Sequence, residues 1–131
     1  MSQKINIMIC GGRDFNNYPL LEKKVLEDLQ DYLSKHPTLT QFNPRYTTII
    51  SGKARGADTL GEMFARKFGL QIEEHPALWN VYGRRAGMIR NEEMVNISDI
   101  VIIFHDGKSR GTAHDLELCK IKNKTYYYHK Y

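Results

Sequence analysis

The stretch that decides the fold is Ile5-Asn6-Ile7-Met8-Ile9-Cys10-Gly11-Gly12-Arg13-Asp14-Phe15, an apolar run that stops at two glycines and a charged pair. Such a run is typical of a strand buried on both faces of a parallel sheet. Glycines let backbone N–H groups approach an anion, and an arginine binds phosphate oxygens two at a time. The stretch therefore predicts the first strand of an open α/β sheet, followed by an anion-binding turn.

Strand and helix patterns alternate along the rest of the chain. Apolar and β-branched runs predict strands over residues 5–10, 47–51, 70–75, 99–104 and 125–128. Apolar residues at helical spacing predict a first helix that is capped by Asn16 or Asn17 and ends by His36, and further helices over 60–68, 88–98 and 112–123. Five strands and four helices in alternation predict a three-layer α/β fold with a mostly parallel sheet.

Composition places limits on the class of protein. The chain has 131 residues, of which 41% are hydrophobic, so we expect residues 1–131 to form a single domain. The net charge of +4 is mild and suits phosphorylated small molecules as well as nucleic acid. Two cysteines fit reduced core thiols, and no leader or apolar run of about 20 residues is present. We therefore expect a cytoplasmic protein without a membrane partner.

Four short loops follow expected strands and hold six of the eight arginines; they cover residues 11–14, 52–58, 82–91 and 106–112. In a doubly wound sheet, ligands lie outside the carboxyl ends of the strands, so these loops should open onto one edge. Arginines of a solvated surface would be scattered over helix faces, whereas only Arg45 and Arg66 lie outside the loops. The loops therefore predict one shared phosphate pocket.

The predicted ligand-binding residues come from these loops and their flanks. They are Gly11, Gly12, Arg13, Asp14, Ser51, Gly52, Arg55, Gly56, Asp58, Trp79, Tyr82, Arg84, Arg85, Arg90, Asn91, Arg110, Gly111 and Thr112. Trp79 and Tyr82, in an aperiodic segment interpreted as a functional loop, are either core aromatics or a stacking platform for a nucleobase. Asp58 either accepts a hydrogen bond from a ribose hydroxyl or caps the following helix.

Two further patterns have alternative interpretations. Thr59 with Glu62 forms a capping box, and Thr112 with Asp115 forms either a second one or a phosphate contact beside an acid or base. No Gly-Lys-Ser/Thr ending and no GxGxxG motif occur, which argues against a Walker-type NTPase and a standard dinucleotide dehydrogenase. The histidines near the fourth loop lack further ligands at suitable spacing, so we expect no metal site and no cofactor.

Four ordered motifs resemble the SLOG superfamily. They are Gly-Gly-Arg-Asp-Phe (11–15), Ser-Gly-x-Ala-Arg-Gly-Ala-Asp (51–58), Tyr-Gly-Arg-x-Ala-Gly-x-Ile-Arg-Asn-x-x-Met (82–94) and Asp-Gly-x-Ser-Arg-Gly-Thr-Ala (106–113). That superfamily contains small Rossmann-like proteins, the LONELY GUY cytokinin-activating phosphoribohydrolases and the DNA-processing protein DprA. The resemblance covers about residues 5–128. It implies a Rossmann-like fold that binds a nucleotide or a nucleotide-derived ligand, such as an ADP-ribose-type signal.

The resemblance also implies roles for single residues. Arg90, followed four residues later by Met94, matches an arginine of the enzyme branch that acts at the N-glycosidic bond, and Asp115 falls on the position of its glutamate. The residues Arg110, Gly111 and Thr112 fall where that branch holds phosphate. Asp115 is one carbon shorter than glutamate, and the Pro-Gly-Gly part of the loop is replaced, which favours binding without chemistry.

We therefore expect a sensor or sequestering protein for a nucleotide-derived ligand. The alternative is a nucleoside 5′-monophosphate phosphoribohydrolase that releases base and ribose 5-phosphate, with Arg90 and Asp115 as catalytic residues, and an enzymatic role stays open. Single-stranded nucleic acid is a disfavoured partner, because the net charge is mild and few aromatics are expected at the surface. The aromatic tail at 126–131 predicts a homo-oligomer, since a small domain does not cover that apolar area alone.

Overall fold

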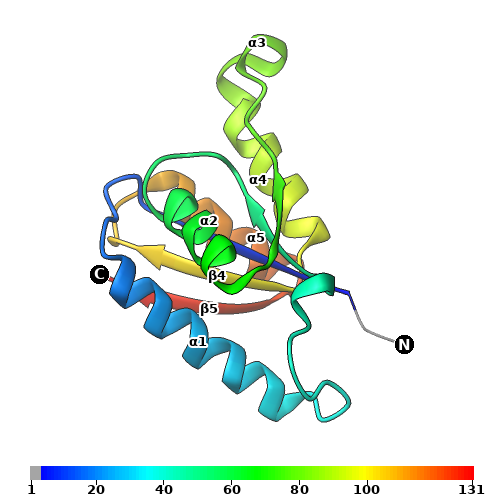
Figure 1. Cartoon of the computed structure of the whole chain (residues 1–131). Coiled ribbons are helices and arrows are strands. Elements are labelled where there is room, and N and C mark those ends of the chain that lie inside the picture. Colours follow the sequence, from blue (N-terminus) through cyan, green and yellow to red (C-terminus); the bar gives the residue numbers. More distant parts are fainter. Residues whose placement is uncertain (1–3) are drawn as a thin grey trace.

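The computed structural model describes residues 4–131 and has a five-stranded sheet at its centre (Figure 1). The strands are β1 (Ile5–Gly11), β2 (Thr47–Ser51), β3 (Gln71–Glu74), β4 (Ile100–His105) and β5 (Thr125–Lys130). They lie in the order β3-β2-β1-β4-β5, and every neighbouring pair is parallel. The predicted Rossmann-like α/β fold is confirmed, and the sheet described here is entirely parallel.

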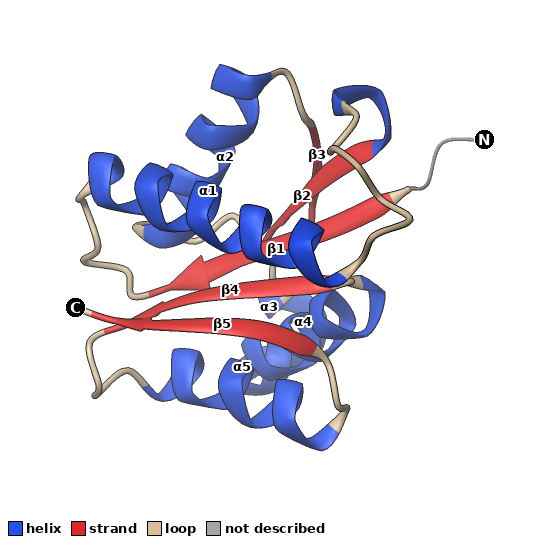
Figure 2. Ribbon diagram, turned by 90° about the horizontal axis from the view of Figure 1, so that it is seen from below, coloured by secondary structure: helices blue, strands red, loops and turns tan. Residues whose placement is uncertain are grey.

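Helices cover both faces of this sheet. They are α1 (Tyr18–Lys35), α2 (Ala57–Phe68), α3 (Trp79–Tyr82), α4 (Ala86–Ile97) and α5 (Arg110–Ile121), with short 3-10 helices η1 (Pro44–Tyr46) and η2 (Gly83–Arg85). Helices α1 and α2 lie on one face and α4 and α5 on the other (Figure 2). Within residues 4–131, none of the helices combines the length and the apolar content that crossing a membrane requires.

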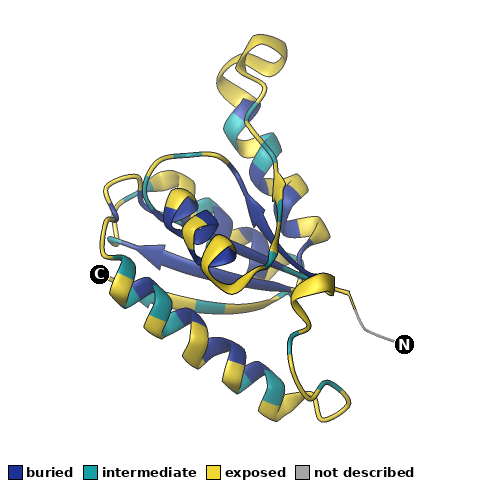
Figure 3. Cartoon of the chain, viewed as in Figure 1, coloured by how far each residue is buried: buried dark blue, intermediate teal, exposed yellow. Residues whose placement is uncertain are grey.

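The apolar run of β1 is buried on both sides. Ile5, Ile7 and Ile9 pack in the core under α1 and α2, whereas Met8 and Cys10 pack in a second core under α4 and α5. Successive side chains of a strand point to opposite faces, so a strand covered on both faces has no polar alternation. Figure 3 shows the buried central strands and the exposed end of the molecule at α3.

The first helix has a predicted cap, but α2, α4 and α5 begin earlier than predicted. Asn17 accepts a hydrogen bond from the Leu20 N–H (3.1 Å) at the start of α1, and α1 ends at Lys35 with His36 as its C-cap. Helix α2 is preceded by Gly56 and helix α5 by Ser109. The two predicted capping boxes, and the interpretation of Asp58 as a cap, are therefore wrong. The acidic side chains involved lie inside the helices and make other contacts.

The segment interpreted as an aperiodic loop is partly helical. Helix α3 and η2 follow one another and project from the body of the molecule at the start of α4 (Figure 1). Its apolar side chains, including Trp79 and Val81, are exposed because no core lies beneath them. A segment with no buried face has no apolar periodicity, which explains why the pattern of the sequence does not show these short helices.

Candidate functional site

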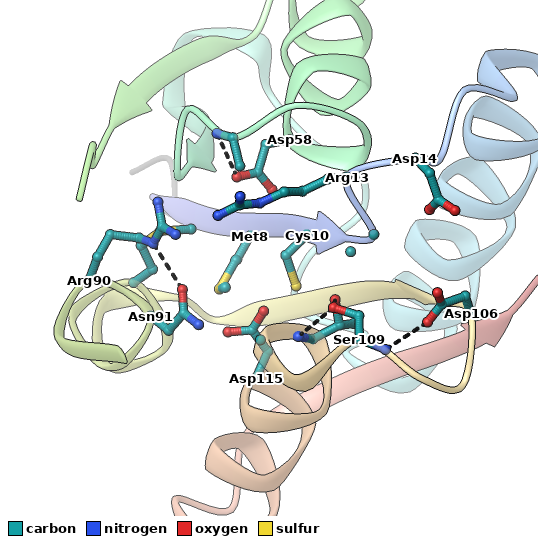
Figure 4. Close-up of a pocket in the computed structure, with 16 residues that line it drawn as sticks. Met8, Cys10, Arg13, Asp14, Asp58, Arg90, Asn91, Asp106, Ser109 and Asp115 are labelled. Carbon is teal, nitrogen blue, oxygen red and sulfur yellow. Dashed lines mark hydrogen bonds between the residues drawn. The ribbon is translucent and has the colours of Figure 1, made fainter. Parts of the chain in front are cut away.

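A pocket of about 400 Å³ lies at the carboxyl edge of the sheet (Figure 4). Strands β2 and β3 lie on one side of β1, and β4 and β5 on the other, so the connections from β1 and β4 separate at this point. Ligands of open α/β sheets bind in the crevice at such a switch point. This main pocket is lined by Met8, Cys10, Gly11, Gly12, Arg13, Asp14, Ala54, Asp58, Arg90, Asn91, Met94, Asp106, Ser109, Gly111, Thr112 and Asp115.

A second hollow, which we call the side pocket, lies next to the main pocket and also has a volume of about 400 Å³. Arg13, Ala54 and Arg90 line both pockets and so form the boundary between them. The rest of the side pocket is formed by Gly52, Lys53, Arg55, Pro76, Ala77 and Trp79. The two hollows therefore adjoin, and we describe them together as a two-part site over the ends of β1 and β2.

Glycines bring the first two loops into direct contact. The Gly12 carbonyl accepts a hydrogen bond from the Ala57 N–H (3.2 Å), and the Gly12 N–H donates to the Phe104 carbonyl (3.0 Å). Gly56 has a φ of +76°, and a Cβ atom at this position would lie 2.1 Å from the Gly12 carbonyl oxygen. Only glycine allows both this backbone conformation and this approach.

The fourth loop is held by the carboxylate of Asp106. Its Oδ1 accepts hydrogen bonds from the N–H groups of Lys108 and Ser109, each at 2.8 Å. These bonds to the charged form lower the pKa of Asp106. The loop leads directly into α5, and Gly111 in the first turn of this helix lines the main pocket. The positive end of the α5 dipole is thus placed at the site.

Two arginines, Arg13 from the first loop and Arg90 from helix α4, reach the boundary of the two pockets. Arg90 is anchored by hydrogen bonds from Nη1 to the Gly52 carbonyl (2.5 Å) and from Nε to Asn91 Oδ1 (2.9 Å). A Cβ atom at Gly52 would lie 2.8 Å from Arg90 Nη1, so a larger residue there would displace the Arg90 guanidinium. Arg13 extends from the first loop toward Arg90 (Figure 4). Their convergence provides charge for an anionic group.

Two buried carboxyl groups form part of the pocket wall. Asp58 Oδ2 accepts a hydrogen bond from the Ala54 N–H (3.1 Å), yet burial raises the pKa of Asp58 to about 6. Asp115 Oδ1 has no hydrogen-bond partner among residues 4–131. Burial raises the pKa of Asp115 to about 7; the charge of Asp58 acts in the same direction, whereas Cys10 and Arg90 oppose it. Both groups therefore exchange protons near neutral pH.

The sequence analysis did not predict several residues that line the main pocket. Met8 and Cys10 contribute apolar surface and sulfur atoms to the main pocket, and Asp106 and Ser109 contribute polar atoms (Figure 4). Met94 also lines this pocket. The alternation of side chains along β1 could have indicated that residues 8 and 10 share the face near α4 and α5. In the described part of the chain, no group of three or more His, Cys, Asp or Glu side chains is arranged to hold a metal ion.

Most of the predicted site residues line one of the two pockets, but six do not: Ser51, Gly56, Tyr82, Arg84, Arg85 and Arg110. The buried Ser51 hydroxyl donates to Glu62 Oε2 (2.6 Å), so it is directed away from the site. Tyr82 and its neighbouring arginines lie on the projecting α3 and η2 segment, and Arg110 is exposed at the start of α5. Glycine next to arginine in a loop therefore does not by itself place the arginine in a pocket.

A solved structure with a similar fold is that of DNA processing protein A from Helicobacter pylori, which has a unique single-stranded DNA binding mode. The TM-score is 0.59 at 19% identity, and the similarity covers 95% of this chain and 64% of that one. It supports the fold. It also overturns the expectation that nucleic acid is a disfavoured partner, because a protein of this fold binds single-stranded DNA. That expectation was based partly on the mild net charge of the whole chain. Net charge does not show that several cations gather at the carboxyl edge of the sheet.

Two sequence relationships add to this likeness. The Gene 61 protein of Mycobacterium phage D29 is 37% identical over 78 residues, which is 55% of this chain and 62% of that protein. The chain thus matches less than two thirds of the length of this relative. Residues 5–82, from β1 to the end of α3, match the YAcAr family, described as the YspA, cpYpsA-related SLOG family. The predicted resemblance is confirmed: the match spans more than half of the chain, and the protein belongs to the YspA and cpYpsA-related SLOG family.

Proposed function

We propose that the two-part site binds a phosphorylated nucleotide or a nucleotide-derived ligand of the ADP-ribose type, and that the protein acts as a sensor or sequestering protein. The observation that carries this proposal is the convergence of Arg13, from the first loop, and Arg90, from helix α4. Within residues 4–131, neither guanidinium forms an ion pair with a carboxylate. Two guanidinium groups that reach one boundary without an ion pair favour an anionic ligand.

The rest of the site suits the other parts of such a ligand. Each pocket has the size of a small-molecule site, which is typically about 300–1,000 Å³. Met8 and Met94 supply apolar contact for a base or sugar, and the Asp58 carboxylate is of the type that accepts hydrogen bonds from ribose hydroxyls.

The proposal is tested by two measurements. Mass spectrometry of the small molecules released by denaturing the purified protein should detect a nucleotide. In calorimetric titrations with AMP and ADP-ribose, Arg90→Ala should weaken binding by about 1.5–3 kcal/mol, the size of a charge-assisted contribution. Arg45→Ala, on the exposed η1, is the matched control and should bind as the wild type does. Equal affinities of all three proteins would reject the site.

The second candidate function is cleavage of a nucleoside 5′-monophosphate into base and ribose 5-phosphate. It is favoured by one observation, the buried Asp115 carboxyl with an unpartnered oxygen and a pKa of about 7 in the same pocket as Arg90. Arg90 would orient the substrate, and Asp115 would stabilise the cationic transition state or activate water. Incubation with AMP, other nucleoside monophosphates, NAD and ADP-ribose, followed by chromatography for free base, tests this. Under this mechanism the Asp115→Asn variant binds the nucleotide but does not cleave it. Recovery of unaltered nucleotide from the wild type would exclude the mechanism.

Single-stranded nucleic acid is a further candidate ligand, because Helicobacter pylori DNA processing protein A binds single-stranded DNA. In this chain Tyr82, Arg84 and Arg85 lie exposed on the segment that projects beside the site (Figure 1). Aromatic and cationic side chains of this kind stack on bases and contact phosphates. Anisotropy of a labelled oligonucleotide, measured at low and at physiological salt, distinguishes this function from small-molecule binding. An Arg84→Ala/Arg85→Ala double variant should bind the oligonucleotide more weakly and bind the small molecules as the wild type does.

We also propose that the chain self-associates through β5. This strand is at an edge of the sheet and carries the partly exposed Tyr126 and Tyr128. An unpaired strand edge with aromatic side chains favours contact with a second copy. Light scattering should show a homodimer or a dimer of dimers at micromolar concentration, and a monomer at that concentration would reject the proposal.

A further inference from the structure

The charges of the two pockets differ, and we infer from this that the phosphate end of the ligand binds in the side pocket and the nucleoside end in the main pocket. This inference rests on the proposed function and gives the ligand a direction. It differs from the arrangement implied by the resemblance, in which Arg110, Gly111 and Thr112 of the fourth loop hold the phosphate.

The main pocket is rich in acidic groups. Besides Arg13 and Arg90 it is lined by four aspartates: Asp14, Asp58, Asp106 and Asp115. Asp106 is held in its charged form by two backbone N–H groups of the fourth loop. A phosphate placed against this loop would meet that carboxylate, and like charges at short distance repel. Carboxylates instead accept hydrogen bonds from sugar hydroxyls, so this pocket suits the nucleoside end.

The side pocket has the opposite character. Its charged lining residues are all cations, Arg13, Lys53, Arg55 and Arg90, and no acidic residue lines it. The charge of Lys53 is offset by ion pairs with Glu62 (3.1 Å) and Glu74 (3.3 Å). Three arginines remain, and among the residues that the structure describes Arg55 has no carboxylate partner either.

The loop beneath the side pocket is preorganised. Lys53 has a φ of +61°, a conformation that is unfavourable for a residue other than glycine and persists only where its surroundings enforce it. The enforcing contacts are a hydrogen bond from the Lys53 N–H to Ser51 Oγ (3.2 Å) and one from the Ser51 hydroxyl to the buried Glu62. The backbone of the second loop is therefore fixed in place before a ligand binds.

Trp79 forms a wall of the side pocket and is 53% exposed. It is the only tryptophan of the chain. Its fluorescence therefore reports occupancy of the side pocket without a label. A ligand that fills only the main pocket leaves the surroundings of this indole unchanged.

The experiment titrates the wild type and three variants with inorganic pyrophosphate, ribose 5-phosphate and adenosine, followed by Trp79 fluorescence and by calorimetry. Pyrophosphate should change the fluorescence, and adenosine should not. Arg55→Ala should weaken pyrophosphate binding by about 10- to 100-fold, the loss of a charge-assisted contact, without changing the affinity for adenosine. Arg45→Ala should match the wild type, and the thermal unfolding of each variant confirms that it is folded.

In place of Arg110, which lines neither pocket, the third variant is Thr112→Val, at the fourth-loop hydroxyl that lines the main pocket; it decides between the two placements of the phosphate. A loss of pyrophosphate affinity that is equal to or larger than that of Arg55→Ala would place the phosphate at the fourth loop and overturn the inference. Pyrophosphate binding without a fluorescence change would overturn it too. Failure of the proposed function has a different outcome: nucleotides do not bind, while pyrophosphate still binds in an Arg55-dependent way. Binding of AMP that is indifferent to Arg55 would instead leave the proposed function intact and reject the inference.

Discussion

Replacement of Asp115 by asparagine should stabilise the protein at about pH 8, and by much less at about pH 5. The Asp115 carboxyl is buried, and burial raises its pKa from the ordinary value of 3.8 to about 7. Because the folded pKa lies above the unfolded one, the folded protein holds a proton that the unfolded chain releases within this window. The free energy of unfolding therefore falls as pH rises from about 4 to about 7, and the loss is complete above the folded pKa.

The magnitude follows from the difference between the two pKa values. The step from 3.8 to about 7 is roughly 3 units, and each unit corresponds to about 1.4 kcal/mol, so ionised Asp115 costs the fold roughly 4 kcal/mol. Relaxation and water entry reduce such costs in real proteins. Since asparagine carries no charge, we expect Asp115→Asn to raise the free energy of unfolding by about 2–4 kcal/mol at about pH 8.

The assay is urea unfolding of wild type and variant at both pH values. Asp106→Asn is the matched control: backbone N–H groups lower the pKa of Asp106, so this variant should lose stability at the higher pH. Two results would refute the reasoning that Asp115 is a buried, uncompensated carboxyl. One is that Asp115→Asn changes the free energy of unfolding equally at both pH values; the other is that it lowers this free energy at the higher pH.

Other predictions concern the loops and the end of β5. Gly56→Ala should lower the free energy of unfolding by about 2–4 kcal/mol, because a Cβ atom would collide with the Gly12 carbonyl at a φ of +76°. Gly69→Ala, at a φ of +69° with open space around the Cβ position, should lower the free energy of unfolding by only about 1–2 kcal/mol. Equal losses of thermal stability for the two variants would contradict the predicted clash at Gly56. Tyr131→Phe removes a hydrogen bond to Asp14 (2.6 Å) and should cost about 0.5–1.5 kcal/mol in urea unfolding, and an unchanged midpoint contradicts this.

The sequence by itself determined the order and type of the main elements. The strand predicted over 47–51 has those bounds in the structure, and Asn17, one of the two predicted caps, is the N-cap of the first helix. These features depend on neighbouring residues, on apolar runs that end at glycine and on a capping side chain, so a local pattern is enough to find them. The family was also readable, because its four motifs lie in short segments.

Tertiary structure decided which of the loop residues share a site. Arg13 and Arg90 meet at one boundary, whereas Arg110, in an equally glycine-rich loop, lines neither pocket. The difference depends on where each helix begins and on what anchors the side chain, such as the Gly52 carbonyl that binds Arg90. The pKa of Asp115 likewise follows from burial beneath loops that are far apart in the sequence, and the desolvation of a carboxyl is a property of the packed fold rather than of a residue pattern.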